Sequence, residues 1–149
     1  MKVLAILQNQ WFRDPDRVRT FIERRPELRR AFIRRALFAG GRTGCMLKAG
    51  LGEEWCRKIV FDEASPEIGG EASSVFPADP AHLRAVIDEV KPTVILALGR
   101  IASDGIAAIM PMPSLVPVAT IINVIHPTAR GVDTLPLLRD ARAILDKLT

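Results

Sequence analysis

Residues 3–10 read VLAILQNQ, an unbroken apolar run from Val3 to Leu7 that ends in three polar amides. Three comparable runs follow along the chain: KIVF at residues 58–61, TVILAL at 93–98 and ATIINVI at 119–125. Short apolar runs of this kind are typical of strands that are buried on both faces of a sheet. The chain is therefore predicted to contain four buried β-strands.

Amphipathic segments separate these four runs. Apolar residues recur at helical spacing over residues 21–37, with a break predicted at Pro26. Asp79-Pro80 is typical of a helix start, and residues 101–110 and 137–148 predict two further helices. Strands that alternate with helices indicate a parallel sheet covered on both faces. We predict an α/β fold, a three-layer α/β/α sandwich with a four-stranded parallel sheet, formed by one domain over residues 1–149.

Two segments between the predicted elements are rich in glycine. AGGRTG at residues 39–44 predicts a turn, followed by a short helix from Cys45 to Leu51. DEASPEIGGEASSVFP at residues 62–77 predicts a long loop, and long loops in compact domains usually have a function. We interpret this second segment as a binding loop or lid.

Composition excludes several classes of protein. The chain has 149 residues, of which 48% are hydrophobic and 26% charged, as in a soluble globular domain. Its longest apolar stretch, residues 116–125, is about half as long as a membrane span, and the run after Lys2 is too short for a secretory signal. We expect a cytoplasmic monomer that does not contact membranes. Cys45 and Cys56 form no metal-binding motif, so no metal and no cofactor are expected.

Positive charge is concentrated in the first third of the chain. Residues 11–42 contain ten arginines and four acidic residues, whereas the whole chain has a net charge of +4. Arginine offers a planar fork of donors that suits phosphate, so this excess favours a polyanionic partner such as nucleic acid. The alternative is a solvated basic helix face without a ligand. Charge alone does not decide between the two.

Polar residues follow the predicted strands. Asn9 follows the first strand, Asp62 the second and His126 the last. Ligands of parallel α/β sheets bind beyond the carboxyl ends of the strands, so we expect these three side chains in one cleft. A histidine there is either a donor or general acid near neutral pH, or an ordinary core residue. His82, in the first turn of an amphipathic helix, is interpreted as an ordinary surface residue.

Four segments resemble, in order and spacing, the motifs of the uracil-DNA glycosylase superfamily. VLAILQNQWF (3–12) is similar to an apolar strand that runs into Gly-Gln-Asp-Pro-Tyr-His, and it puts Asn9 where the family has a water-activating Asp or, in other branches, Asn. FAGGRTGCML (38–47) resembles Phe-x-Gly-Arg-x-Gly-x-x-Leu with one extra glycine. VKPTVILALGRIA (90–102) is similar to the segment that leads into Leu-Gly-x-x-Ala, and HPTAR (126–130) resembles the last motif, His-Pro-Ser or its variants.

The resemblance implies a uracil-DNA glycosylase-like fold and a hydrolase of DNA repair. Such an enzyme flips a uracil or another deaminated or damaged base out of single- or double-stranded DNA and hydrolyses its N-glycosidic bond. By the resemblance, Asn9 orients the water, and His126, with the backbone N–H near Gln8, stabilises negative charge on O2 of the leaving base.

The resemblance also implies contacts to the base and to the DNA. Phe38 stacks on the flipped base, with Trp11 or Phe12 at the rim of the pocket. Arg42 and the other arginines of residues 13–42 bind phosphates. Thr128 or Arg130, in the last motif, enters or braces the opened strand.

Two departures from the family pattern change what is expected. The family reads uracil with an Asn after its second strand, where this chain has Asp62 and then Glu63. An ionised carboxylate only accepts hydrogen bonds, so Asp62 suits a base that presents amino hydrogens, unless it is protonated or the alignment shifts by a residue. The four cysteines that hold an iron–sulfur cluster in some branches are missing, so no cluster is expected.

Two other functions stay open at this point. The first is a DNA-binding module that keeps the fold but lacks activity, which Asn9 and Asp62 together suggest. The second is a flavodoxin-like or Rossmann-like protein that binds a small ligand, with the arginines as a solvated face.

Overall fold

A four-stranded parallel sheet forms the centre of the computed structural model, which describes residues 1–71, 73–115 and 117–149. Its strands lie in the order β3-β1-β5-β6. Their bounds are β1 Val3–Leu7, β3 Val60–Glu63, β5 Val94–Leu98 and β6 Thr120–Val124. In β1, Leu4 is paired with Val60 on one side and with Ile95 on the other. All four carboxyl ends therefore meet at one edge of the sheet.

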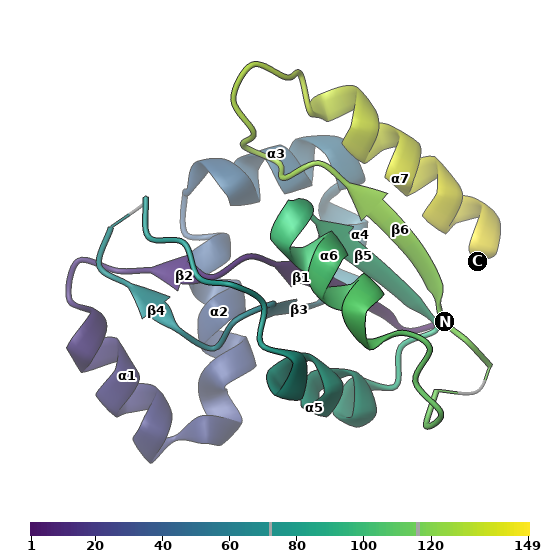
Figure 1. The fold of residues 1–149 in the computed structure, drawn as a ribbon. Helices are drawn as coiled ribbons and strands as arrows, with labels where there is room; N and C mark the ends of the chain where they lie inside the picture. Colours follow the sequence, from purple (N-terminus) through teal and green to yellow (C-terminus); the bar gives the residue numbers. More distant parts are fainter. Residues whose placement is uncertain (72, 116) are drawn as a thin grey trace.

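Helices cover both faces of this sheet (Figure 1). One face carries α5 (Pro80–Val90) and α6 (Arg100–Ile109), and the other carries α3 (Arg42–Leu51), α4 (Glu53–Lys58) and α7 (Leu135–Leu148). Alternate residues of each strand enter the two cores: in β1, Ala5 packs toward α3 and α7, and Ile6 toward α5 and α6. The predicted α/β architecture with a four-stranded parallel sheet is confirmed.

A smaller group of elements lies beyond the carboxyl ends of β1 and β3 (Figure 1). It contains α1 (Pro15–Arg24), the 3₁₀ turn η1 (Pro26–Leu28), α2 (Arg29–Leu37) and a parallel pair formed by β2 (Gln10–Trp11) and β4 (Ile68–Gly69). The helical pattern breaks at Pro26 as predicted. In this group, the ring of Phe32 lies 5.4 Å from Phe12 and 5.5 Å from Phe21, measured between centroids.

The segment around the second strand differs from the prediction. Lys58 ends α4, so the strand begins at Val60, and it continues through Asp62 and Glu63, which were expected in a loop. Residues 62–77 also contain β4, so they are not a plain loop. The charged residues Asp62 and Glu63 interrupt the apolar pattern from which a buried strand is predicted. Their partners belong to helices that lie far away in the sequence, so no local pattern indicates that these charges are neutralised. Similarly, α3 begins at Arg42 rather than Cys45.

Candidate functional site

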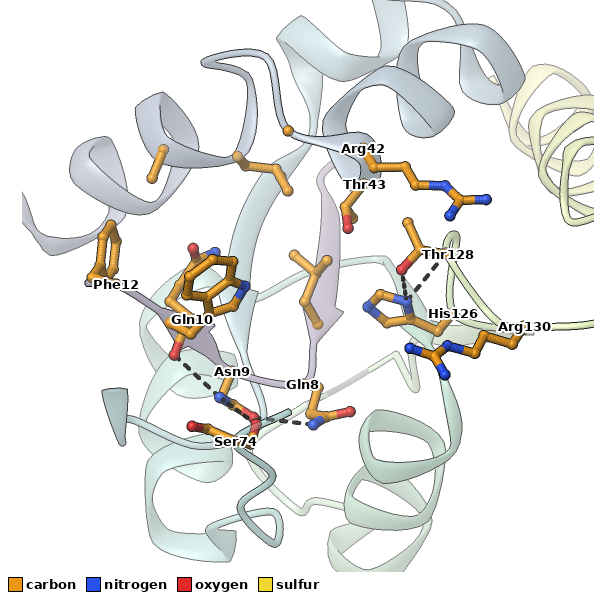
Figure 2. A pocket seen from close by; sticks show the side chains of 15 residues that line it. Gln8, Asn9, Gln10, Phe12, Arg42, Thr43, Ser74, His126, Thr128 and Arg130 are labelled. Atoms are coloured by element: carbon orange, nitrogen blue, oxygen red, sulfur yellow. Dashed lines mark hydrogen bonds between the residues drawn. The ribbon is translucent and has the colours of Figure 1, made fainter. Parts of the chain in front are cut away.

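A pocket of about 650 Å³ opens beyond the carboxyl end of β1. Its walls come from residues 7–12, from the junction of α2 and α3, from Ser74 and from the segment after β6. Figure 2 shows side chains from all these segments around one space. Eight residues predicted for the site or for its rim line this pocket: Gln8, Asn9, Trp11, Phe12, Arg42, His126, Thr128 and Arg130.

Hydrogen bonds hold the side-chain amide of Asn9 in a single orientation. Its Nδ2 donates to the backbone oxygen of Gln10 over 3.1 Å and to that of Ser74 over 3.4 Å. Its Oδ1 accepts from Nε2 of Gln8 over 3.2 Å. Both donors of Asn9 are therefore occupied by main-chain oxygens, and the amide oxygen keeps a second lone pair for a ligand or a water.

His126 follows β6 and is oriented by its own loop. The backbone N–H of Thr128 donates to Nδ1 of His126 over 3.2 Å, and the Thr128 hydroxyl lies 3.1 Å from the same atom. Burial lowers the pKa of His126, so the ring is neutral at pH 7. A neutral ring whose Nδ1 accepts a hydrogen bond carries its proton on Nε2. Figure 2 shows that the ring edge opposite Thr128 faces the pocket.

Gly99, at the end of β5, makes room for this histidine. Its φ is +98°, a conformation that favours glycine, and a Cβ placed there would lie 3.1 Å from the Cβ of His126. Its backbone N–H donates to the oxygen of Val124 over 2.7 Å. These two contacts of Gly99 fix the position of the chain just after β6, and with it the position of His126.

Cationic and polar groups stand on two other walls of the pocket, one formed by the start of α3 and one by the segment after β6. Arg42 and Thr43 open α3, and Arg130 follows the His126 loop (Figure 2). The N-cap of α3 is Gly41, whose lack of a side chain leaves the first backbone N–H groups of the helix without a side-chain cap. A helix N-terminus beside arginine favours an anionic ligand.

The aromatic residues that line the pocket do not include Phe38, which was predicted to stack on a base. Trp11, 46% exposed, and Phe12 line the pocket. Phe38 does not line it: its ring packs edge-on against Phe61 with centroids 5.4 Å apart, and the cation of Arg34 lies 5.4 Å from its centroid. Phe38 is the C-cap residue of α2, and its partly buried side chain packs against the core formed by α3, α4, α7 and the sheet.

Asp62 also lies outside the pocket, which corrects the expectation that it reads a ligand there. Its side chain is 1% exposed and accepts from Arg29 over 2.6 Å and from Arg30 over 2.8 Å, with His82 Nε2 at 3.3 Å. Burial alone would raise the pKa of Asp62, but His82 and the two arginines outweigh it and lower this pKa below its ordinary range. Asp62 is thus ionised, and its contacts connect β3 to α2 and α5.

This cluster corrects two further expectations. His82 is not an ordinary surface residue, because only 15% of its side chain is exposed and it faces Asp62. Arg29 and Arg30 are not available to phosphates, since Arg29 also bonds Glu63 over 3.0 Å and Arg30 bonds Glu89 over 2.8 Å. Part of the positive charge counted in the sequence is therefore neutralised inside the fold.

Gln10, Thr43 and Ser74 also line the pocket and were not predicted. Gln10 stands in the same Gln-Asn-Gln run as Gln8 and Asn9, so the sequence held a signal for it. Ser74 belongs to the segment 62–77 that was interpreted as a binding loop or lid, and it lies at the pocket next to the paired strands β2 and β4. There Gly69 allows a close approach: a Cβ on it would lie 2.2 Å from the Cβ of Ser74.

Comparisons of the chain with protein-family models, curated proteins and solved structures gave no significant match. Among the described residues, no group of three or more His, Cys, Asp or Glu side chains is placed to hold a metal ion. No helix in the described ranges is both long enough and apolar enough to cross a membrane.

Proposed function

We propose that this protein is a DNA glycosylase of the uracil-DNA glycosylase type, with the fold of that superfamily, acting in the cytoplasm. It flips a uracil or another deaminated or damaged base into the pocket and hydrolyses the bond between base and deoxyribose. One observation carries the proposal: Asn9, held with a free lone pair on its oxygen, and a neutral His126 with an Nε2 donor line the same pocket.

Asn9 positions the attacking water. Its Oδ1 accepts from Gln8 and has one lone pair left to accept from a water near the sugar. An amide is not a base, so Asn9 contributes orientation rather than proton abstraction. This role predicts a slow enzyme.

His126 stabilises the leaving base. Cleavage of the glycosidic bond places negative charge on O2 of a pyrimidine, and the Nε2–H of a neutral imidazole donates to that oxygen. Because the charge develops in the transition state, the hydrogen bond is stronger there than in the ground state. Thr128 holds the tautomer that this step requires.

The remaining walls of the pocket suit DNA around a flipped base. Arg42, Arg130 and the uncapped N-terminus of α3 provide donors for phosphates. Trp11 and Phe12 provide aromatic faces for stacking, the role that the sequence had given to Phe38.

An excision assay tests the proposal. Oligonucleotides that contain uracil, hypoxanthine, xanthine or a mismatch are incubated with the protein, and abasic sites are then cleaved with alkali. We expect a cleaved product with at least one base, lost in Asn9→Ala and His126→Ala. No product with any base, together with salt-sensitive DNA binding, identifies an inactive binding module instead.

One observation favours a small-ligand protein as the second candidate. The sheet order, with the first strand between the second and the third, is that of flavodoxin-like proteins, whose ligands bind beside the first strand. Absence of DNA affinity at low salt would favour this candidate, because several phosphate contacts give a steep dependence on salt.

A further inference from the structure

The strand β6 ends the central sheet, and its outer edge pairs with no strand of the described ranges. The sheet order is β3-β1-β5-β6, so β6 has β5 as its neighbour on one side only. Figure 1 shows β6 as the last strand on this side of the sheet. An exposed edge of this kind presents N–H and C=O groups to which another strand can bond.

The contacts with β5 show which residues of β6 direct their backbone groups outward. The N–H of Thr120 and the oxygen of Val124 bond backbone groups directly before and after β5, over 3.0 Å and 2.7 Å. In a strand, backbone groups alternate between its two neighbours, so every second residue from Thr120 to Val124 faces β5. The backbone groups of Ile121 and Asn123 therefore face away from the sheet.

The side chains at this edge form a small, largely apolar surface. Ile122 and Val124 enter the core beneath α7, so Ile121, Asn123 and Ile125 lie on the opposite face. All three are exposed, Ile121 at 36% and Ile125 at 44%. The helix on that face, α6, packs mainly on β5 and β1 and leaves this surface uncovered.

The edge lacks the features that usually keep exposed strands apart. Such edges are protected in most proteins by charged side chains, by proline or by a bulge. Residues 114–129 contain no acidic and no basic residue, and β6 contains no proline. On the adjoining helix, Arg100 and Asp104 lie 3.5 Å apart and offset each other's charge. A second uncharged strand therefore meets no like-charge repulsion along β6.

A separate pocket, of about 440 Å³, lies beside this edge. Its walls come from the start of α6, from residues 123–126 and from Ala129. Asn123 and Ile125 belong both to the exposed edge and to this pocket. A strand that bonds to the edge of β6 can therefore place a side chain in the pocket.

We propose that β6 pairs in antiparallel orientation with β6 of a second copy of this chain, about a two-fold axis at Asn123. The outward residues Ile121, Asn123 and Ile125 read the same in both directions, so the pairing sets Ile121 of each copy opposite Ile125 of the other. Asn123 meets its own copy, and an amide pairs with another amide because it both donates and accepts. This self-complementary edge favours a second copy over a different protein.

The pairing gains contacts of two kinds. The outward backbone groups of the two strands form about six hydrogen bonds, two for each pair of opposed residues. Residues opposed in this way have neighbouring side chains, so Ile121 of the second copy enters the pocket beside Ile125. His126 lines this pocket and also the candidate functional site, so the second copy packs close to that histidine. The dimer differs from the monomer expected from the sequence, and it does not depend on the proposed activity.

Sedimentation of the whole chain tests the dimer. We expect the mass of the wild type to rise from one copy toward two between about 1 and 200 μM. Ile121→Lys places a charge in both halves of the interface and should raise the dissociation constant at least about tenfold. Ile144→Lys, at an apolar position of α7 with 41% exposure, is the matched control and should dimerise as the wild type does. Circular dichroism checks that both variants are folded.

Cysteine cross-linking tests the register. In a Cys45→Ser background, which removes the exposed native thiol, Asn123→Cys should form a disulfide-linked dimer on mild oxidation, because the two copies of residue 123 are adjacent. Ile121→Cys is the control on the same edge. Its two copies lie about 14 Å apart in this register, too far for a disulfide.

Three results overturn the proposal. The first is a wild type that stays monomeric over the whole concentration range, which leaves the edge to an extended segment of a different protein. The second is a dimer that Ile144→Lys weakens and Ile121→Lys does not, which places the interface on α7. The third is cross-linking of Ile121→Cys but not of Asn123→Cys, which excludes the two-fold axis at Asn123.

Discussion

The guanidinium of Arg29 donates to the carboxylate of Asp62 across 2.6 Å, with both side chains largely buried, at 16% and 1% exposure. The same guanidinium bonds Glu63 over 3.0 Å, so a single arginine of α2 contacts both acids at the end of β3. The basic helix α2 is thus attached to β3 by the ion pairs of Arg29 and Arg30.

The Arg29 pair gives the first prediction. Arg29→Ala leaves two buried carboxyls without their shared donor, and we expect it to lower the free energy of unfolding by about 3–5 kcal/mol. Urea denaturation measures the loss. Arg25→Ala, which breaks an exposed pair with Glu27, is the matched control and should change stability far less. Equal losses in the two variants would contradict the structural role of Arg29.

Glu63 makes stability depend on pH. Its folded pKa, about 8, lies above its unfolded value, so the folded state binds more protons between about pH 4.5 and 8. Over that window the contribution of Glu63 falls as the pH rises, by at most about 1.4 kcal/mol per pH unit. Denaturation at several pH values should show that Glu63→Gln gains stability relative to the wild type toward pH 8. A constant difference between the two proteins would count against a buried, protonated Glu63.

The two histidines are expected to have separable effects. Loss of the O2 donor in His126→Ala should lower kcat about 10²- to 10³-fold with little change in DNA affinity, as for other donors to a developing oxyanion. His82→Gln removes a partner of buried Asp62 and should lower the melting temperature while turnover persists. Single-turnover excision and thermal denaturation give the two readouts. A loss of turnover in His82→Gln that is as large as in His126→Ala would mean that the site is misplaced.

The pH profile of excision should report the neutral state of His126. Because burial lowers its pKa, the donor tautomer persists from neutral pH to below the ordinary histidine value of about 6.5. We expect the rate to stay level across pH 6.5 to 7.5 and to fall only at lower pH, as protonation of Nδ1 breaks its bond from Thr128. A rate that rises on acidification in this range would indicate an imidazolium donor.

Two arginines at the pocket are expected to bind phosphate. Arg42→Ala and Arg130→Ala should each weaken DNA binding and reduce the slope of log K against log salt by about one. Arg57→Ala, an exposed arginine of α4 that does not line the pocket, is the control. Fluorescence anisotropy over a range of salt concentrations measures the slope. An unchanged slope in both pocket variants would favour the small-ligand candidate.

The sequence predicted a structural feature correctly where all the residues that define the feature lie in one short segment. The apolar run of β1 and the amides after it predicted both a buried strand and a wall of the pocket. His126 was predicted in the same way, from its position after β6. Asp62 and Glu63 were misplaced because charged residues usually end a strand, and nothing near them in sequence shows that Arg29, Arg30 and His82 neutralise them.

The sequence by itself determined the four parallel strands, because buried strands need continuous apolar runs that can be read locally. It also determined that Asn9 and His126 lie at the same edge of the sheet, since parallel strands share their carboxyl ends. Only the tertiary structure decided which side chains face the pocket. Phe38 packs into a core, Asp62 forms ion pairs, and Gln10 and Ser74 are brought to the wall of the pocket. The contacts responsible join residues that lie 23 to 65 positions apart in the sequence. Such partners depend on packing and charge neutralisation in the folded chain, which no local pattern encodes.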